Sequence, residues 1–431
     1  MEEQAVSDQT RVSILYHPKD APQFINSGYA KIAMYTTPYL LDAGFDTRLH
    51  CPVGQTQSNS IWTEPRKGKT MEIWGGGSGA YGEDIIPLHM RHLTELTGKP
   101  SMLLFCGDVI ALDQVPKWAR EKSIAAAAWG AVDWEWPTPK WALEKISPYM
   151  EMWPMSRWGQ GVLMRDGLKN VRAPIWCGVD TKIWHPVNPS DFPQVKASMG
   201  YGDDTFNVFS AFANQYLRKG EQEMFQAIGE FHKRHPEAKI RFFGLTQVRR
   251  DWDLVAAAEH YGITDLVRWS DDYQHIMGLY PEEDVALMMG VSDCVLSLGY
   301  EGFGFQTVEA QALERPVIGL NAGATPELLR SGILVPAERT LAHTSMIGRA
   351  RPDGPKVVEA LETIWRAKQD GKRWRAGRRW VEENVTWDRC GRMLVEGVRR
   401  VEQALADESS FGPPPPGPLA VERAKDLVVV G

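Results

Sequence analysis

The sequence lacks several features that mark membrane, disulfide-rich and metal-binding proteins. It contains no run of about 18 apolar residues, so no segment is expected to insert stably into a membrane. Residues 1–8 are acidic and polar, unlike a secretory signal peptide, and we expect a cytoplasmic location. The five cysteines are scattered, without a C-x-x-C pair. They predict reduced, buried thiols rather than a disulfide framework or a zinc site.

The chain also lacks an excess of positive charge. Its 48 Lys and Arg residues against 55 Asp and Glu residues give a formal net charge of −7. A protein that binds nucleic acid mainly through phosphates usually carries a basic footprint, and bulk charge gives none here, although a local basic patch stays possible. No internal sequence repeat is present.

The composition is that of a globular protein, with 43% hydrophobic and 24% charged residues in a chain of 431. This length exceeds the roughly 250–300 residues at which a single core stops growing, so we expect two domains. Short apolar runs alternate with helical spacing, which predicts an α/β protein with parallel sheets covered by helices. The predicted parts are an N-terminal domain (1–187), a C-terminal domain (188–380), a helix crossing back to the first domain (381–405) and a Pro-rich tail (406–431).

The most informative segment runs from Glu301 to Glu309, with the sequence EGFGFQTVE. It follows a predicted strand over 294–297 and opens a predicted helix over 305–313. Open α/β sheets bind ligands at this end of their strands. Its glycines allow close backbone approach and present amide donors at a helix N-terminus, which favours an anion. Both carboxylates can face one crevice, where each could accept hydrogen bonds from paired sugar hydroxyls.

The wider pattern resembles the donor site of glycosyltransferase family 4, which has the GT-B fold of two Rossmann-like domains facing a central cleft. The matching segments are Glu301-Gly-Phe-Gly304, Glu309-Ala-Gln-Ala312, Arg315-Pro-Val-Ile-Gly319, Ala322-Gly-Ala-Thr-Pro-Glu327, the crossover Gly178–Pro186 and the turn Asn384–Asp388. The resemblance covers about residues 12–405 and is strongest over 178–327.

This resemblance implies roles for individual residues. Glu309 would hold the ribose of a nucleoside-diphosphate sugar, Glu301 would contact the donor sugar, and Lys219 would neutralise the leaving diphosphate. Gly28, at a helix start, belongs to the family's glycine loop near the phosphates, although helix capping explains it equally well. The donor-binding residues that the resemblance implies are Gly28, Asn214, Arg218, Lys219, Arg268, Trp269, Glu301, Gly302, Phe303, Gly304 and Glu309.

The sequence departs from the family in two places. Asn214 stands where the family has a diphosphate-binding arginine, and the adjacent Arg218 is the available substitute. The histidine that many members carry near the donor sugar is missing. Asp108 and Asp133, which follow predicted strands, are candidates for hydroxyl contacts or for a catalytic base, with a loop cap as the alternative. The predicted catalytic residues are therefore Glu301, Lys219, Asp108 and Asp133.

Two further patterns favour structural interpretations. Asp251 and Asp253 have the Asp-x-Asp spacing of a metal site, but they precede a predicted helix, where carboxylates favour the helix dipole. Six tryptophans fall within residues 129–158, and we expect most of them to pack in the core. The alternative for these rings is a platform that stacks on a sugar or on an extruded base.

The function implied by the resemblance is a retaining, metal-independent transfer of a hexose from a UDP- or GDP-linked sugar to a hydroxyl acceptor, with no cofactor. No carboxylate nucleophile is identifiable, so same-face attack is favoured over double displacement. The acceptor stays open among a glycan, a small molecule, a protein side chain and a hydroxylated DNA base. A phosphorylase and a non-catalytic sugar-nucleotide-binding protein are the alternatives.

Overall fold

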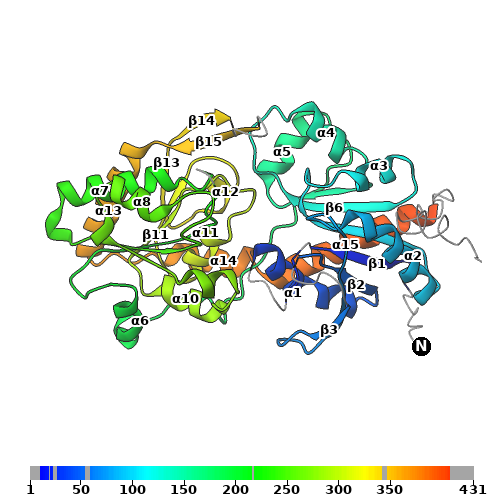
Figure 1. The fold of residues 1–431 in the computed structure, drawn as a ribbon, viewed down its shortest axis with the longest axis horizontal. Coiled ribbons are helices and arrows are strands. Elements are labelled where there is room, and N and C mark those ends of the chain that lie inside the picture. The colour runs from blue at the N-terminus through cyan, green and yellow to red at the C-terminus, as the bar shows by residue number, and fades with distance from the viewer. Residues whose placement is uncertain are drawn as a thin grey trace, which may run out of the picture.

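The structure, a computed structural model, describes residues 10–18, 20–22, 27–53, 59–215, 218–341 and 347–407. It forms two lobes, each with a parallel sheet covered by helices (Figure 1). The predicted α/β class is thus confirmed. Most of the predicted tail (406–431) lies outside the described residues.

In the described part of the chain, the N-terminal domain contains a seven-stranded sheet in the order β3-β4-β2-β1-β5-β6-β7. Only β3 and β4 pair antiparallel. Strands β1, β5 and β6 are covered on both faces, which explains their continuous apolar runs. The strands are β1 (Ser13–His17), β2 (Asp46–His50), β3 (Ser60–Thr63), β4 (Thr70–Trp74), β5 (Ser101–Asp108), β6 (Ala125–Ala131) and β7 (Met152–Pro154). The helices are α1 (Gly28–Asp42), α2 (Ile86–Thr97), α3 (Gln114–Arg120), α4 (Lys140–Ile146) and α5 (Arg157–Arg165).

The C-terminal domain, over its described residues, contains a six-stranded parallel sheet in the order β10-β9-β8-β11-β12-β13 and a separate hairpin, β14-β15. The strands are β8 (Asn207–Ala211), β9 (Arg241–Leu245), β10 (Val267–Trp269), β11 (Cys294–Ser297), β12 (Val317–Leu320), β13 (Gly332–Val335), β14 (Ala337–Leu341) and β15 (Gly348–Pro352). The helices are α6 (Pro193–Ser198), α7 (Glu221–Arg234), α8 (Leu254–His260), α9 (Asp272–Ile276), α10 (Glu282–Gly290), α11 (Phe305–Ala312), α12 (Thr325–Leu328), α13 (Gly354–Gln369), α14 (Arg375–Asn384) and α15 (Trp387–Asp407). Short 3₁₀ turns lie at Glu83–Ile85, Pro189–Asp191, Pro236–Ala238 and Thr264–Leu266.

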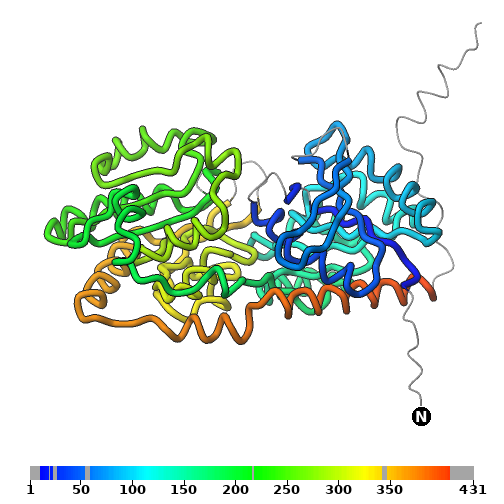
Figure 2. The backbone as a smooth tube through the Cα atoms, turned by 90° about the horizontal axis from the view of Figure 1, so that it is seen from below, coloured from blue at the N-terminus to red at the C-terminus, as the bar shows by residue number. Residues whose placement is uncertain are grey.

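The last helix returns to the N-terminal domain. Figure 2 shows α15 running beneath that domain, where it packs against α1. The rings of Trp387 and Tyr35 stack with centroids 4.5 Å apart. The two chain segments that connect the domains meet at a parallel bridge between Val179 and Thr386. The domains are therefore joined by two crossing segments and by helix packing.

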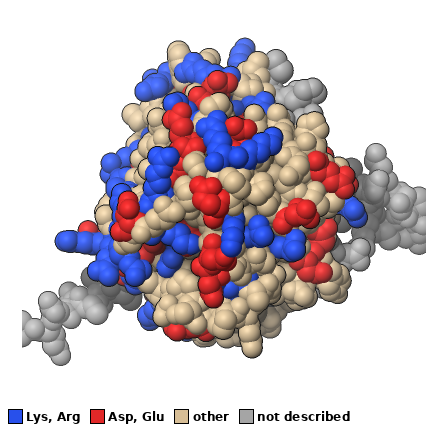
Figure 3. Space-filling view, turned by 90° about the vertical axis from the view of Figure 1, so that its left-hand side faces the viewer, with Lys and Arg blue, Asp and Glu red and all other residues tan. Residues whose placement is uncertain are grey.

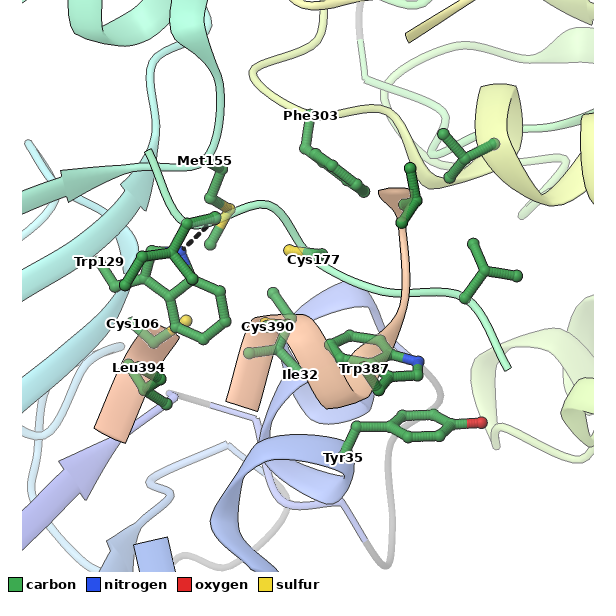
Figure 4. Close-up of a cluster of buried hydrophobic side chains, with 14 of the residues drawn as sticks. Ile32, Tyr35, Cys106, Trp129, Met155, Cys177, Phe303, Trp387, Cys390 and Leu394 are labelled. Atoms are coloured by element: carbon green, nitrogen blue, oxygen red, sulfur yellow. Dashed lines mark hydrogen bonds between the residues drawn. The ribbon is translucent and has the colours of Figure 1, made fainter. Parts of the chain in front are cut away.

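A buried apolar cluster lies where the domains meet (Figure 4). The indole of Trp129 donates to the carbonyl of Ile175 at 3.0 Å, which fixes the crossing segment against β6. Phe303 enters this cluster from the loop before α11 and is 3% exposed. All five cysteines are buried, as predicted, and free.

Four of the six clustered tryptophans pack in the core, including the half-buried Trp158, as predicted for most of them. Trp129, Trp134 and Trp153 are fully buried, whereas Trp136 and Trp141 are 45% and 40% exposed. On the end face of the C-terminal domain, acidic and basic side chains are intermixed (Figure 3). Within the described part of the chain, every helix is too short or too polar to cross a lipid bilayer.

Candidate active site

A cavity of about 1040 Å³ lies between the two domains. Its N-terminal wall comes from the start of α1 and the ends of β5 and β6, and its C-terminal wall comes from the ends of β8 and β11 and the start of α11. The cavity therefore lies where the carboxyl ends of both parallel sheets face each other, which is where open α/β sheets bind ligands.

The loop Glu301–Gly304 brings the C-terminal domain close to the opposite wall. A Cβ atom on Gly302 would lie 2.6 Å from the Cβ of Ala131 and 2.8 Å from the amide nitrogen of Val132, so only glycine fits. Gly304 has φ of +91°, a conformation that L side chains rarely adopt, and it caps α11. The N-terminus of α11 opens on the cavity, where its free amides and dipole favour an anion.

Lys219 and Glu301 form an ion pair in the cavity wall. Their side chains are only 13% and 21% exposed. Burial and the neighbouring Arg218 lower the pKa of Lys219. Burial by itself would raise the pKa of Glu301, but the charges of Lys219 and Arg218 outweigh burial, so the pKa of Glu301 is lowered. The structure therefore places two predicted catalytic residues in contact, with a third charge beside them.

Asp108 and Asp133 face the same cavity from the N-terminal domain. Burial, and then the charge of Asp133, raise the pKa of Asp108 to about 6. Asp133 pairs across the cavity with Arg218 at 3.2 Å and with Arg349 at 3.4 Å. A carboxyl group with a pKa near neutrality is suited to accept or donate a proton, which keeps Asp108 a candidate base.

Glu309 is 6% exposed, does not line the cavity and is paired with the other domain. Its Oε1 lies 2.5 Å from Nζ of Lys31 on α1, and the same Nζ lies 3.1 Å from Oε1 of Glu282. Burial lowers the pKa of Lys31, but Glu309 and Glu282 together raise it above its ordinary value. Burial raises the pKa of Glu309 against the opposing effect of Lys31. Phe305, which lines the cavity, lies beneath Lys31.

Four of the predicted donor-binding residues do not line the cavity: Glu309, described above, and Asn214, Arg268 and Trp269. The side-chain amide of Asn214 donates to backbone carbonyls of the loop after β9, 2.7 Å from that of Trp252, and Asn214 is 1% exposed. Trp269 packs against Phe225 and Phe242 in the core. Arg268 is exposed at the sheet edge, against Gly200. Asn214 is held away from the cavity by its hydrogen bonds, Trp269 by its packing and Arg268 by its position on the edge strand.

The remaining predictions have local explanations. Gly28 lines the cavity, while the preceding Ser27 caps α1 by accepting a hydrogen bond from the amide of Ala30 at 3.1 Å. Asp253 caps α8, which confirms the helix-start interpretation of the Asp-x-Asp pattern, and Asp251 lines the cavity.

Sequence reasoning missed two charged residues of this region. Lys31 stands one turn after Gly28, but only the domain arrangement reveals its pairing with Glu309. Arg349 comes from the hairpin β14-β15, which has no recognisable motif.

Comparisons with known proteins agree with this geometry. Residues 207–349 match the family described as "Glycosyl transferases group 1". Sucrose-phosphate synthase from Thermosynechococcus elongatus has a similar structure, with a TM-score of 0.67 at 14% identity, over 92% of this chain and all of that one. The fold is therefore GT-B, as predicted.

Two curated relatives are similar in sequence. One is a GDP-mannose-dependent monoacylated alpha-(1-6)-phosphatidylinositol monomannoside mannosyltransferase of Corynebacterium glutamicum, 25% identical over 51% of this chain and 53% of that protein. The other is a D-inositol 3-phosphate glycosyltransferase of Paenarthrobacter aurescens, 26% identical over 53% of this chain and 51% of that protein. The chain thus spans about half the length of the relatives it matches. The chain thus has the GT-B fold, and residues 207–349 are similar to group 1 glycosyltransferases.

Proposed function

We propose that this protein transfers a hexose from a GDP- or UDP-linked sugar to a hydroxyl acceptor. The observation that carries the proposal is the cavity between the two domains, where the Lys219–Glu301 pair stands at the open N-terminus of α11. A diphosphate there would meet Lys219, Arg218 and the amides of the helix terminus. The family match over 207–349 covers the C-terminal wall of this cavity.

The donor would exchange partners with groups that are already paired. Its diphosphate would replace Glu301 at Lys219, which frees Glu301 for the hydroxyls of the donor sugar. The ribose would take Glu309 in place of Lys31. Because both carboxylates are buried with a compensating cation, the site without ligand avoids the cost of an unpaired buried charge.

The proposed chemistry retains the anomeric configuration without a metal or other cofactor. The bond from the anomeric carbon to the diphosphate breaks as the acceptor oxygen attacks the same face, and the acceptor proton passes to the leaving diphosphate. Lys219 and Arg218 would stabilise the charge that develops there, which is usually the largest contribution to such a rate. Asp108, which lines the cavity, would hold or relay the acceptor proton on its way to the diphosphate.

For the acceptor we propose a hydroxyl of a sugar or polyol. The names of the two relatives support this class, since both describe transfer to inositol-containing acceptors. Tyr29 and Tyr81 line the N-terminal side of the cavity, together with Asp108, and they give it a polar surface suited to hydroxyl groups.

Turnover tests the proposal directly. The protein is incubated with GDP-mannose, UDP-glucose and related donors, with inositol phosphates or simple sugars as acceptors, in EDTA, and release of nucleoside diphosphate is measured. We expect one donor class to react and Lys219→Met to slow turnover by about 10²–10³-fold. NMR of the product reports the anomeric configuration. If the wild type releases nucleoside diphosphate no faster than Lys219→Met with any donor, the proposal is contradicted. A requirement for metal would contradict the metal-independent form of the proposal.

A further inference from the structure

The hairpin β14-β15 belongs to the C-terminal domain in sequence but reaches the N-terminal domain. Figure 1 shows it crossing above the space between the lobes toward α5. Its strands pair antiparallel from Ala337 opposite Pro352 to Leu341 opposite Gly348. It is separate from the six-stranded sheet, and it is held by packing of Ala350 in a small buried cluster with Tyr300 and Leu320 and by contacts at its two ends.

Each end of the hairpin is anchored to a different domain. At its base, Nε of Arg351 lies 2.8 Å from Oε1 of Glu223 on α7. At its far end, the carbonyl of Gly348 accepts a hydrogen bond of 2.7 Å from the amide of Glu135, in the loop after β6. Ile347 is 2% exposed and belongs to the N-terminal buried cluster that includes Trp134. The hairpin is thus a strap between the domains.

Arg349 lies next to the far anchor, and its side chain lines the cavity. Its Nη2 lies 3.4 Å from Oδ2 of Asp133, and Nη1 of Arg218 lies 3.2 Å from the same oxygen. The three side chains are between 20% and 22% exposed. Both arginines also act on the carboxylate of Glu301, the partner of Lys219. They are therefore available to a diphosphate that takes the place of Glu301 at Lys219.

We propose that Arg349 binds the donor diphosphate together with Arg218 and Lys219. The inference rests on the proposed function and adds to it a residue from outside the family-like motifs. It also accounts for Asn214, whose amide is committed to backbone carbonyls and supplies no charge to the cavity. Arg349 follows Gly348, whose carbonyl is bonded to the N-terminal domain, so the proposed phosphate site includes a residue next to a contact between the domains.

Titration calorimetry with GDP and UDP, and with the corresponding nucleosides, tests this role. Arg349→Met should weaken binding of the preferred diphosphate by about 10- to 100-fold, the range for hydrogen bonds to a charged group, and should leave nucleoside affinity unchanged. Arg349→Lys should lose less, because it keeps the charge. Arg339→Met is the matched control: Arg339 is on the same hairpin, is 78% exposed and lies 3.9 Å from Glu135. The diphosphate affinity of Arg339→Met should equal that of the wild type.

A separate variant distinguishes two roles of Arg349, namely binding of phosphate and pairing with Asp133 alone. Asp133→Asn removes the competing carboxylate, so it should tighten diphosphate binding if Arg218 and Arg349 both turn to phosphate. Equal diphosphate affinity of Arg349→Met and wild type would overturn the inference and leave the proposed function standing. An equal loss of diphosphate affinity in Arg339→Met would overturn the inference, because it would show that the hairpin contributes only by docking on the N-terminal domain. Absence of diphosphate binding by the wild type would overturn both.

Discussion

Glu301 and Glu309, eight residues apart, are both held by lysines from other elements. Glu301 pairs with Lys219 within its own domain, and Glu309 pairs with Lys31 across the domain boundary. Sequence reasoning predicted the carboxylates from their spacing and from the glycines between them. It could not predict the role of Lys31, because the sequence around a helical lysine does not show which distant residue will contact it in the folded protein.

Asp108 gives a prediction at the residue scale. Its pKa is raised from 3.8 to about 6, so the folded state binds the proton more tightly than the unfolded chain. The contribution of Asp108 to stability is therefore greatest below pH 3.8 and is lost as the pH rises through about 6. Asp108→Asn removes this dependence and should be about 1–3 kcal/mol more stable than the wild type at pH 7.5, but not at pH 4.

Urea unfolding at both pH values measures this difference. A pH-independent difference between Asp108→Asn and the wild type would show that Asp108 is not the group with the raised pKa. If Asp108 is the catalytic base, the wild-type turnover should also rise with pH, with a midpoint near 6.

At the scale of elements, the sequence predicted the regular units well and the irregular ones poorly. The strand over 294–297 is β11, and the helix from 305 ends at Ala312, one residue before the prediction. The segment predicted as one crossing helix (381–405) consists of the end of α14 and most of α15, with a break after Asn384. The hairpin β14-β15 was not predicted, because its strands are polar and its position depends on Ile347 in the core of the other domain.

The packing of α15 on α1 gives a prediction at this scale. A Cβ atom on Gly391 would lie 2.3 Å from the ring of Tyr39, so Gly391→Ala must move one helix from the other. Overpacking of this kind should destabilise the protein by about 1–3 kcal/mol. Gly161→Ala in α5 is the matched control, because its Cβ meets nothing within 4 Å, and it should stabilise by up to about 1 kcal/mol.

Denaturant unfolding of the two variants compares the sites directly. Equal stability of Gly391→Ala and Gly161→Ala would mean that the close contact between α1 and α15 does not support the fold. The comparison also tests whether the last helix holds the N-terminal domain, since α15 follows the second crossing segment.

At the scale of the whole molecule, the domains meet through apolar and charged contacts around one cavity. Helix α15 runs along the bottom of the molecule in Figure 2, and the strap lies at the top of Figure 1, so the domains are joined on two different sides. The GT-B fold could be predicted because its motifs are local in sequence. The cross-domain pairs Lys31–Glu309 and Arg349–Asp133 could not, because they exist only when two independently patterned domains face each other.

The central claim is that this cavity binds a nucleoside diphosphate through Glu309. Thermal unfolding of the wild type and Glu309→Ala, with GDP or UDP and with or without EDTA, tests it most directly. Without nucleotide, the variant should stay folded, because Lys31 keeps its pair with Glu282. We predict that one nucleotide raises wild-type stability, by about 2.7 kcal/mol at 100 times its Kd, regardless of EDTA, and does not stabilise Glu309→Ala. No shift with either nucleotide, or an equal shift in Glu309→Ala, would contradict the account.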